Sequence, residues 1–228
     1  MDDAPLTRRG SLLKLGGGLA ALLAPALVRG SEAEAGTGPA GVASGAVSCV
    51  LAPEQTEGPY YVPNERVRRT ITEGRPGTPL TLRLRVVDAS TCKPVKGASV
   101  DVWHCDALGV YSGVQGNSGT FMRGVQRTDA TGLALFTTVY PGWYQGRTVH
   151  IHVMVHLGGN VVHTGQLYFA DALTDAVYAK KPYSRRPGRT TRNADDAIFR
   201  NGGSRSMLAL KRANGRYTGS ITMGVHRT

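Results

Sequence analysis

The chain has 228 residues, of which 41% are hydrophobic and 19% are charged, and its formal net charge is +11 at pH 7. A positive balance of this size would suit a nucleic-acid-binding protein, but aromatic residues are not interleaved with the basic ones in an RNA-binding pattern. We therefore expect no nucleic-acid partner. About 180 residues lie from Cys49 onward, which is enough for one domain with a substantial core.

The N-terminal part of the chain is expected to be an export signal rather than part of the fold. Arg8 and Arg9 precede a stretch over residues 12–28 that is rich in Leu, Ala and Gly, which is the pattern of a twin-arginine (Tat) signal. This stretch is too short and too interrupted to span a membrane. We expect a Tat-type signal over residues 1–35, a flexible linker over 36–48, and an extracellular or periplasmic protein without a stable membrane anchor.

Short strand-like segments alternate with turn-forming residues through the rest of the chain. In residues 81–87, Leu and Val alternate with Arg, so that one face is apolar and the other is charged. The segments expected to form strands are residues 81–87, 99–103, 132–139, 150–155, 161–162, 166–169 and 217–225. Only residues 171–178 and 195–199 are expected to form short helical turns. This pattern predicts an all-β fold over residues 49–228, an antiparallel β-sandwich with long functional loops.

Three cysteines in a protein that is expected to be exported allow one disulfide and one free thiol. Cys49 and Cys92 both lie in loop-like sequence, whereas Cys105 follows the expected strand at 99–103. This favours a bond between Cys49 and Cys92 with Cys105 buried and free, and the other pairings stay open. A cysteine-based zinc site is not expected, because the sequence contains no C-x-x-C pair.

His150 and His152 form the most informative pair in the chain. On a strand, two residues separated by one share a face at a spacing of about 6.6 Å, and imidazole binds Zn, Cu, Fe and Ni. The residues of opposite parity are apolar and would anchor the strand in a core. From this pair alone, metal binding and a solvated polar face stay equally open. His156 has the same parity but lies about 20 Å from His150, too far to share an ion.

Three further motifs accompany this pair. Residues 103–111 read Trp-x-x-Asp-x-x-Gly-x-Tyr, residues 141–152 read Pro-Gly-x-Tyr-x-x-Arg-x-x-His-x-His, and Gln166 precedes a Leu-Tyr-Phe strand. Together with the Thr-Glu-Gly-Pro-Tyr-Tyr run at 56–61, they make the chain resemble the intradiol ring-cleavage dioxygenases, the family of protocatechuate 3,4-dioxygenase and catechol 1,2-dioxygenase. The resemblance covers nearly everything from Glu54 to the C-terminus. The combination is highly specific, although each motif alone is weak.

The resemblance implies a mononuclear non-haem Fe(III) enzyme that cleaves the ring of a small-molecule catechol with O2 to give a cis,cis-muconate-type diacid. The four iron ligands that it implies are Tyr111, Tyr144, His150 and His152. Tyr111 and His150 would be equatorial and the other two axial, with hydroxide or water in the fifth position. The residue types suit this chemistry, because phenolate is a hard anionic donor that stabilises Fe(III) over Fe(II).

The resemblance also implies roles for residues beside the iron. Those that match family positions lining the substrate pocket are Arg147, Gln166 and Tyr60. Tyr144 would act as a general base on leaving its axial position, and Arg147 would stabilise negative charge on the ring. Three residues of the same motifs are interpreted as structural: Trp103, Asp106 and Trp143.

A second interpretation belongs to a different class of protein, a non-catalytic secreted β-sandwich that binds aromatics or a polymer, with iron incidental. The complete ligand set favours the enzyme. A zinc hydrolase is disfavoured, because neither a carboxylate nor a third histidine lies near the pair. Catechol 1,2-dioxygenases carry an N-terminal helical segment that forms a dimer with a lipid-lined tunnel. The residues before Glu54 leave no room for it, so we expect no dimer by that route, and the oligomeric state stays open.

Six basic residues crowd into the segment 180–192: Lys180, Lys181, Arg185, Arg186, Arg189 and Arg192. Weak adsorption to acidic extracellular polymers is one interpretation of this run, and a solvated loop is the other. The ring substituents of the substrate are not indicated by any motif. Three residues could each bind a carboxylate on the ring, and the sequence does not choose among them: Arg123, Arg127 and Lys180.

Overall fold

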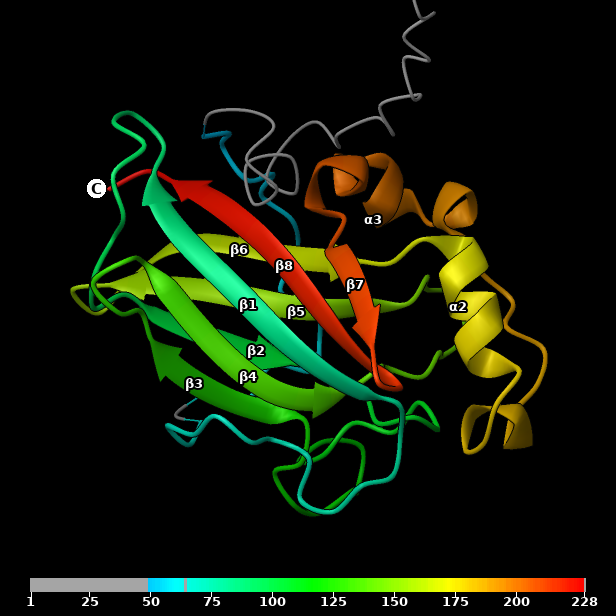
Figure 1. The fold of residues 1–228 in the computed structure, drawn as a ribbon. Coiled ribbons are helices and arrows are strands. Elements are labelled where there is room, and N and C mark those ends of the chain that lie inside the picture. The colour runs from blue at the N-terminus through cyan, green and yellow to red at the C-terminus, as the bar shows by residue number, and fades with distance from the viewer. Residues whose placement is uncertain (1–48, 64, 228) are drawn as a thin grey trace, which may run out of the picture. The chain divides into compact units, whose positions relative to one another are not determined.

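The computed structural model describes residues 49–63 and 65–227, so the expected export signal and linker lie outside the described residues. Two four-stranded sheets dominate this part of the chain (Figure 1). Sheet A has the strand order β4-β1-β8-β7, formed by β1 (Pro79–Asp88), β4 (Leu133–Val139), β7 (Ala209–Ala213) and β8 (Arg216–Val225). Sheet B has the order β3-β2-β5-β6, formed by β2 (Ser99–Trp103), β3 (Arg123–Arg127), β5 (His150–Leu157) and β6 (Asn160–Tyr168). The all-β prediction is confirmed, with β1 and β8 running parallel and the other paired strands antiparallel.

The main core lies between the two sheets, with sheet A in front of sheet B in Figure 1. Alternate residues of β1 point inward, so Leu82 and Leu84 are fully buried while Arg83 between them is exposed. From sheet B, Ile151 and Val153 enter the same core. Each such side chain contributes roughly 1.5–3 kcal/mol to stability when fully buried. The predicted apolar parity of the histidine strand is therefore confirmed.

The opposite side of sheet B is also buried, which the strand pattern does not predict. Trp103 and Met154 point away from sheet A and form a second small cluster with Tyr111. Tyr60 and Tyr61, from the segment that precedes sheet A in the chain, pack against this cluster. This covering explains why β5 is buried on both faces over its first six residues.

The helices lie at one end of the strands (Figure 1). α2 (Asp171–Tyr178) matches the expected helical turn, and α3 (Ala197–Arg200) begins two residues later than expected, after η2 (Asn193–Asp195). The remaining short helices are η1 (Tyr183–Arg185) and η3 (Gly203–Ser206). Among the helices of the described residues, none combines the length and apolar character needed to cross a membrane.

A disulfide joins Cys49 to Cys92, whose Cα atoms are 5.3 Å apart, and Cys105 is buried and free. The favoured pairing is thus confirmed. The bond ties the first described residue to the loop between β1 and β2.

Candidate metal centre

The residues predicted to form the site meet on the side of sheet B that faces away from sheet A. His150 and His152 start β5, and His152 lies directly opposite Gln166 on β6. Tyr144 and Arg147 belong to the loop before β5, Tyr111 to the loop between β2 and β3, and Tyr60 to the segment before β1. The structure therefore brings together side chains that the sequence spreads over more than a hundred positions.

Three polar atoms converge at the start of β5. The Nε2 atom of His150 is 3.0 Å from the Tyr144 hydroxyl and 3.0 Å from Nε2 of His152. The Nδ1 atom of His150 donates a hydrogen bond to the Thr148 carbonyl at 2.7 Å. A carbonyl only accepts, so this bond places the ring proton on Nδ1 and leaves a lone pair on Nε2. That lone pair points at the neighbours that would share an ion with it.

Tyr111 completes the group. Its ring lies 5.6 Å from that of Tyr144 and 6.3 Å from that of His152. Its buried hydroxyl has no hydrogen-bond partner among the described residues, nor does Nδ1 of His152. A buried polar group without a partner costs about 1–3 kcal/mol, so such groups call for an explanation. A bound ion beside the Tyr111 hydroxyl would supply one.

The protonation states also suit metal binding. Burial lowers the pKa of His150 to about 3 and the pKa of His152 well below its ordinary value. Both imidazoles are therefore neutral at physiological pH, as a metal ligand must be. Burial raises the pKa of the Tyr111 and Tyr144 hydroxyls above 10. Coordination to a cation would reverse this shift and supply phenolates at neutral pH.

The donor set is two imidazole nitrogens and two phenol oxygens. Within residues 49–63 and 65–227, no group of three or more His, Cys, Asp or Glu side chains could hold a metal ion. A metal at this place would thus have the tyrosines among its ligands. Hard anionic oxygen donors favour a cation of high charge, so the residues present fit ferric iron.

Two neighbours fix the position of His152. The Trp103 indole stacks on its ring, with the centroids 4.8 Å apart and the planes 6° from parallel. Gly58 approaches from the N-terminal segment, and a Cβ atom there would lie 3.3 Å from Cε1 of His152. Gly58 also has a φ of +74°, so both the close approach and the backbone conformation favour glycine.

Arg147 is held between β6 and the segment that leads into α3. Its Nη2 donates to Oε1 of Gln166 at 2.5 Å, and its Nε donates to Oδ2 of Asp196 at 2.9 Å. The same Asp196 oxygen accepts the backbone N–H of Thr148 at 2.8 Å. Asp196 was not identified from the sequence. Its place just before a helical turn indicates an N-cap, but not its contact with Arg147, which lies 49 residues away.

Tyr60 packs beside the two predicted tyrosine ligands. Its ring lies 4.7 Å from that of Tyr111 and 6.0 Å from that of Tyr144. Its hydroxyl accepts a hydrogen bond from Nε2 of Gln115 at 3.0 Å. Tyr60 therefore lies within reach of a molecule bound between the tyrosines.

The three residues that could bind a carboxylate on the substrate ring lie in different places in the structure. Arg123 lies beside Tyr111, 5.9 Å from its ring centre, and donates to the Ser112 carbonyl at 2.7 Å. Arg127 lies at the opposite end of β3, and Lys180 lies beyond the end of α2. Arg123 is thus already engaged with the backbone that follows Tyr111.

The interpretation of Asp106 and Trp143 as structural agrees with their contacts. Oδ1 of Asp106 accepts the N–H groups of Leu108 and Val110 at 2.9 and 3.0 Å, which shapes the turn before Tyr111. Nε1 of Trp143 donates to the Arg186 carbonyl at 3.0 Å.

Known proteins are similar to this chain in sequence and fold. The family model described as "Dioxygenase" matches residues 56–183, which is more than half of the chain. An intradiol ring-cleavage dioxygenase from Tetranychus urticae is 34% identical, with a TM-score of 0.75, over 78% of this chain and 95% of that one. The chain belongs to the intradiol ring-cleavage dioxygenases. The expected resemblance is confirmed, and with it the enzyme class, an oxidoreductase.

The matches to other intradiol relatives cover different shares of the two chains. The dioxygenase domain of a dioxygenase–carbohydrate-binding fusion from Streptomyces sp. SirexAA-E is 32% identical, with a TM-score of 0.62, over 78% of this chain and all of that one. A curated catechol 1,2-dioxygenase from Acinetobacter lwoffii is 37% identical over 105 residues. That match covers 42% of this chain and 38% of the relative's length.

Proposed function

We propose that this intradiol dioxygenase is a mononuclear non-haem Fe(III) enzyme. It opens the ring of a catechol-type substrate with O2 and forms a cis,cis-muconate-type diacid. The observation that carries the proposal is the contact of the Tyr144 hydroxyl and the Nε2 atoms of two neutral histidines. The Tyr111 ring lies beside them, and its buried hydroxyl has no partner among the described residues. The relative from Acinetobacter lwoffii, named a catechol 1,2-dioxygenase, supports catechols as the substrate class.

Tyr111, Tyr144, His150 and His152 would hold the iron. Ferric iron held there would supply a Lewis acid for the two oxygens of a deprotonated catechol, which would activate the ring toward O2. In the overall reaction the bond between the two hydroxylated carbons breaks. Both atoms of O2 enter the product, which carries one carboxyl group at each end.

Tyr144 and Arg147 have separate tasks in this proposal. The Tyr144 oxygen, as a phenolate, would accept a proton from an incoming catechol hydroxyl. Arg147 is permanently cationic and is fixed by Gln166 and Asp196. Its charge would stabilise negative charge that builds up on the ring during the reaction, at no cost in reorganisation. Tyr60 would contact the face or edge of the substrate ring.

We also propose that the protein acts outside the cytoplasm, after export by the Tat route. The Cys49–Cys92 disulfide supports this, because such bonds persist in oxidising compartments. The Arg8–Arg9 pair before an apolar stretch supports the route. Fractionation of cells that express the native chain or an Arg8→Lys/Arg9→Lys variant tests both points. The variant is expected to remain inside, and equal export of the two chains would contradict the Tat route.

Turnover of catechol tests the reaction. Purified protein loaded with Fe(III) is mixed with catechol under 18O2, and oxygen uptake and the products are followed. The proposal expects one O2 consumed per catechol and two labelled oxygen atoms in a diacid. A product cleaved beside the diol, which would carry an aldehyde, would contradict intradiol cleavage. Binding of a series of substituted catechols without oxygen uptake would instead favour a binding module.

A further inference from the structure

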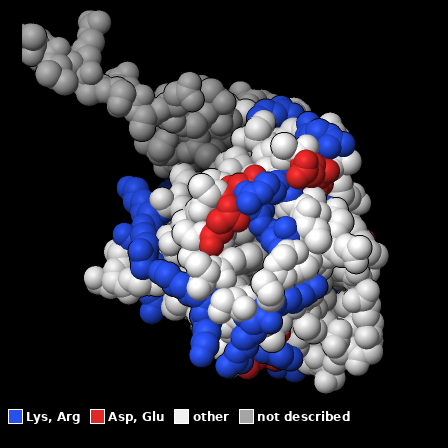
Figure 2. Space-filling view, turned by 90° about the vertical axis from the view of Figure 1, so that its right-hand side faces the viewer, with Lys and Arg blue, Asp and Glu red and all other residues white. Residues whose placement is uncertain are grey.

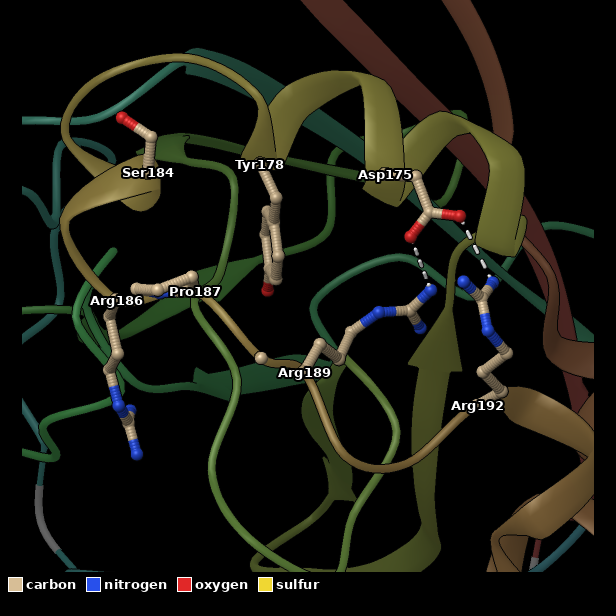
Figure 3. A pocket seen from close by; sticks show the side chains of 8 residues that line it. Asp175, Tyr178, Ser184, Arg186, Pro187, Arg189 and Arg192 are labelled. Carbon is tan, nitrogen blue, oxygen red and sulfur yellow. Dashed lines mark hydrogen bonds and ion pairs between the residues drawn. The ribbon is translucent and has the colours of Figure 1, made fainter.

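Three of the six basic residues in the run at 180–192 are engaged within the protein itself: Arg186, Arg189 and Arg192. Arg189 pairs with Asp171 at 2.6 Å and with Asp175 at 2.8 Å, and Arg192 pairs with Asp175 at 3.0 Å. Figure 3 shows the Asp175 carboxylate bridging the two guanidinium groups, and Figure 2 shows acidic atoms beside basic ones on this side of the molecule. These arginines hold neighbouring segments together and have little charge to offer an acidic polymer.

Arg186 is engaged in a different way. Its Nη1 donates to the carbonyls of Leu108 and Trp143, and its guanidinium lies 4.2 Å from the centre of the Trp143 ring. This residue therefore links the run to the loops around the candidate metal centre. Arg186, Arg189 and Arg192 therefore connect segments of the fold, whereas Lys180, Lys181 and Arg185 take part in no ion pair of the described residues.

Positive charge that forms no ion pair within the described residues lies on the outer face of sheet A. Arg83 and Arg85 on β1 and Lys211 on β7 alternate with inward-facing residues, and Arg83 and Lys211 are exposed. None of the three takes part in an ion pair of the described residues. Arg85 donates a hydrogen bond to the Thr131 carbonyl, in the turn that also holds Asp129. The four strands of sheet A contain one acidic residue, Asp88, at the last position of β1.

Short hydroxyl side chains lie beside these cations. In the strand register, Arg83 is opposite Ser220, Arg85 is opposite Thr222, and Lys211 is opposite Thr218. Paired residues share a face, so each cation has a hydroxyl neighbour on the next strand. The outer face therefore combines basic side chains with the partly exposed hydroxyl residues Thr218 and Ser220, whereas Thr222 is buried.

One hollow lies on this face. It has a volume of about 80 Å³ and is lined by Arg83, Arg85 and residues that include Ser220 and Thr222. Its lining contains no acidic residue. Because β8 lies between β1 and β7, the cations of β1 and β7 are roughly 10 Å apart across the sheet, a spacing that fits a polymer with repeated charges better than one small anion.

We propose that the outer face of sheet A is a docking surface for a carboxylated polysaccharide. Arg and Lys would pair with its carboxylates, and the Ser and Thr hydroxyls would hydrogen-bond its sugar hydroxyls. The outward positions of the four strands carry no aromatic ring on which a nucleic-acid base could stack. A membrane surface would require large exposed apolar residues. None of those in the described part lies on the four strands of sheet A, although Leu51 borders β8 at Gly224, and the others are Val67, Leu108 and Val161.

The proposed surface is independent of the candidate metal centre. The histidines lie on the side of sheet B that faces away from sheet A, and the core separates the two. A bound polymer would therefore leave the candidate metal centre uncovered. The enzyme could be retained on a polymer while small phenolic molecules enter from the opposite side.

Binding of the full-length protein to polygalacturonate tests the proposal, with dextran as the neutral polymer. The variant Arg83→Ser/Arg85→Ser/Lys211→Ser removes three charges from the surface. The matched control Arg66→Ser/Lys96→Ser/Arg200→Ser removes three exposed charges elsewhere. We expect binding about tenfold weaker for the first variant, or about 1.4 kcal/mol. The control is expected to stay within about twofold of the native protein.

Several results would overturn the docking surface. Equal weakening by both triple variants would mean that net charge alone attracts the polymer. Equal binding to dextran, or tighter binding to duplex DNA or to vesicles containing phosphatidylserine, would exclude a carboxylated polysaccharide as the preferred partner. Circular dichroism and catechol turnover verify that each variant is folded. The single variants Arg83→Ser and Lys211→Ser replace the triple if it does not fold, and no loss of binding in either would contradict the proposal.

Discussion

The indole of Trp103 and the imidazole of His152 are stacked almost in parallel, on directly opposed positions of β2 and β5. Trp103 is fully buried, so its ring has little freedom to move. The stack therefore holds the plane of His152, and with it the direction of the Nε2 lone pair. One consequence is that iron affinity should depend on a residue that donates no ligand atom.

Trp103→Phe tests this dependence. The smaller ring leaves space beside His152, and we expect iron to be lost to a chelator about tenfold faster, in line with the effect of residues that orient metal ligands. Trp143→Phe is the matched control, because Trp143 packs against Arg186 rather than against a histidine. Thermal melting separates a general loss of stability from loss of iron. Equal iron retention in the two variants would contradict the role of the stack.

Asp196→Asn tests the support of Arg147. The variant removes the negative partner of a guanidinium that is only 17% exposed, which leaves Gln166 as its remaining side-chain partner among the described residues. We expect kcat with catechol to fall about 10- to 100-fold with iron content unchanged, because Asp196 contacts none of the four predicted ligands. The neighbouring exposed carboxylate supplies the control, Asp195→Asn. If both variants keep native kcat, Asp196 does not position Arg147 for the reaction.

A pH-dependent loss of stability is expected from Asp101. Burial raises the pKa of this carboxyl to about 7, and Tyr61 donates a hydrogen bond to it at 3.2 Å. The folded protein thus keeps a proton that the unfolded chain releases near pH 4, so the free energy of unfolding falls as pH rises from about 4 to 7.

Asp101→Asn should reduce that slope, which is at most about 1.4 kcal/mol per pH unit for one proton. Part of the slope should persist, because burial also raises the pKa of Glu65. The exposed Glu57→Gln is the control. Urea unfolding at several pH values measures the slope, and identical slopes for the native protein and Asp101→Asn would refute the prediction.

The sequence predicts best those features that depend on the regular alternation of apolar and polar residues along a strand. The parity of His150 and His152 against an apolar face follows from the period of a strand, and the structure has both features. The sequence does not predict β3 or β7, although it predicts the other two edge strands, β4 and, in two pieces, β6. β7 is largely exposed, and β3 carries charged and polar residues, so neither shows the apolar alternation of a central strand.

Contacts between distant segments are what the sequence does not reveal. Asp196 reaches Arg147 across 49 positions, and nothing in the local pattern of either residue indicates the other. The same holds for the basic run at 180–192, whose pairing with Asp171 and Asp175 depends on how the chain returns to α2. The site residues were predicted only through the family motifs, because a family resemblance carries information about contacts between distant segments that local patterns lack.

The Cys49–Cys92 bond should contribute measurably to stability. It closes a loop with a sequence separation of 43, for which the chain-entropy model gives about 4 kcal/mol. Cys49→Ser/Cys92→Ser should therefore lower the melting temperature, and a reducing agent should lower that of the native protein to a similar value. Cys105→Ser preserves the bond and is the control. A native protein that melts unchanged in reductant would contradict the contribution of the bond.

The visible absorption spectrum of the Fe(III)-loaded protein tests the tyrosine–histidine centre itself. We expect a coloured protein with a tyrosinate-to-iron charge-transfer band that shifts when catechol is added without oxygen. Tyr111→Phe and Tyr144→Phe should each weaken or displace the band. Tyr140→Phe, a buried core tyrosine bonded to Thr174, should leave it unchanged. A colourless protein after iron loading, or a band that neither Tyr111→Phe nor Tyr144→Phe affects, would contradict the proposed centre.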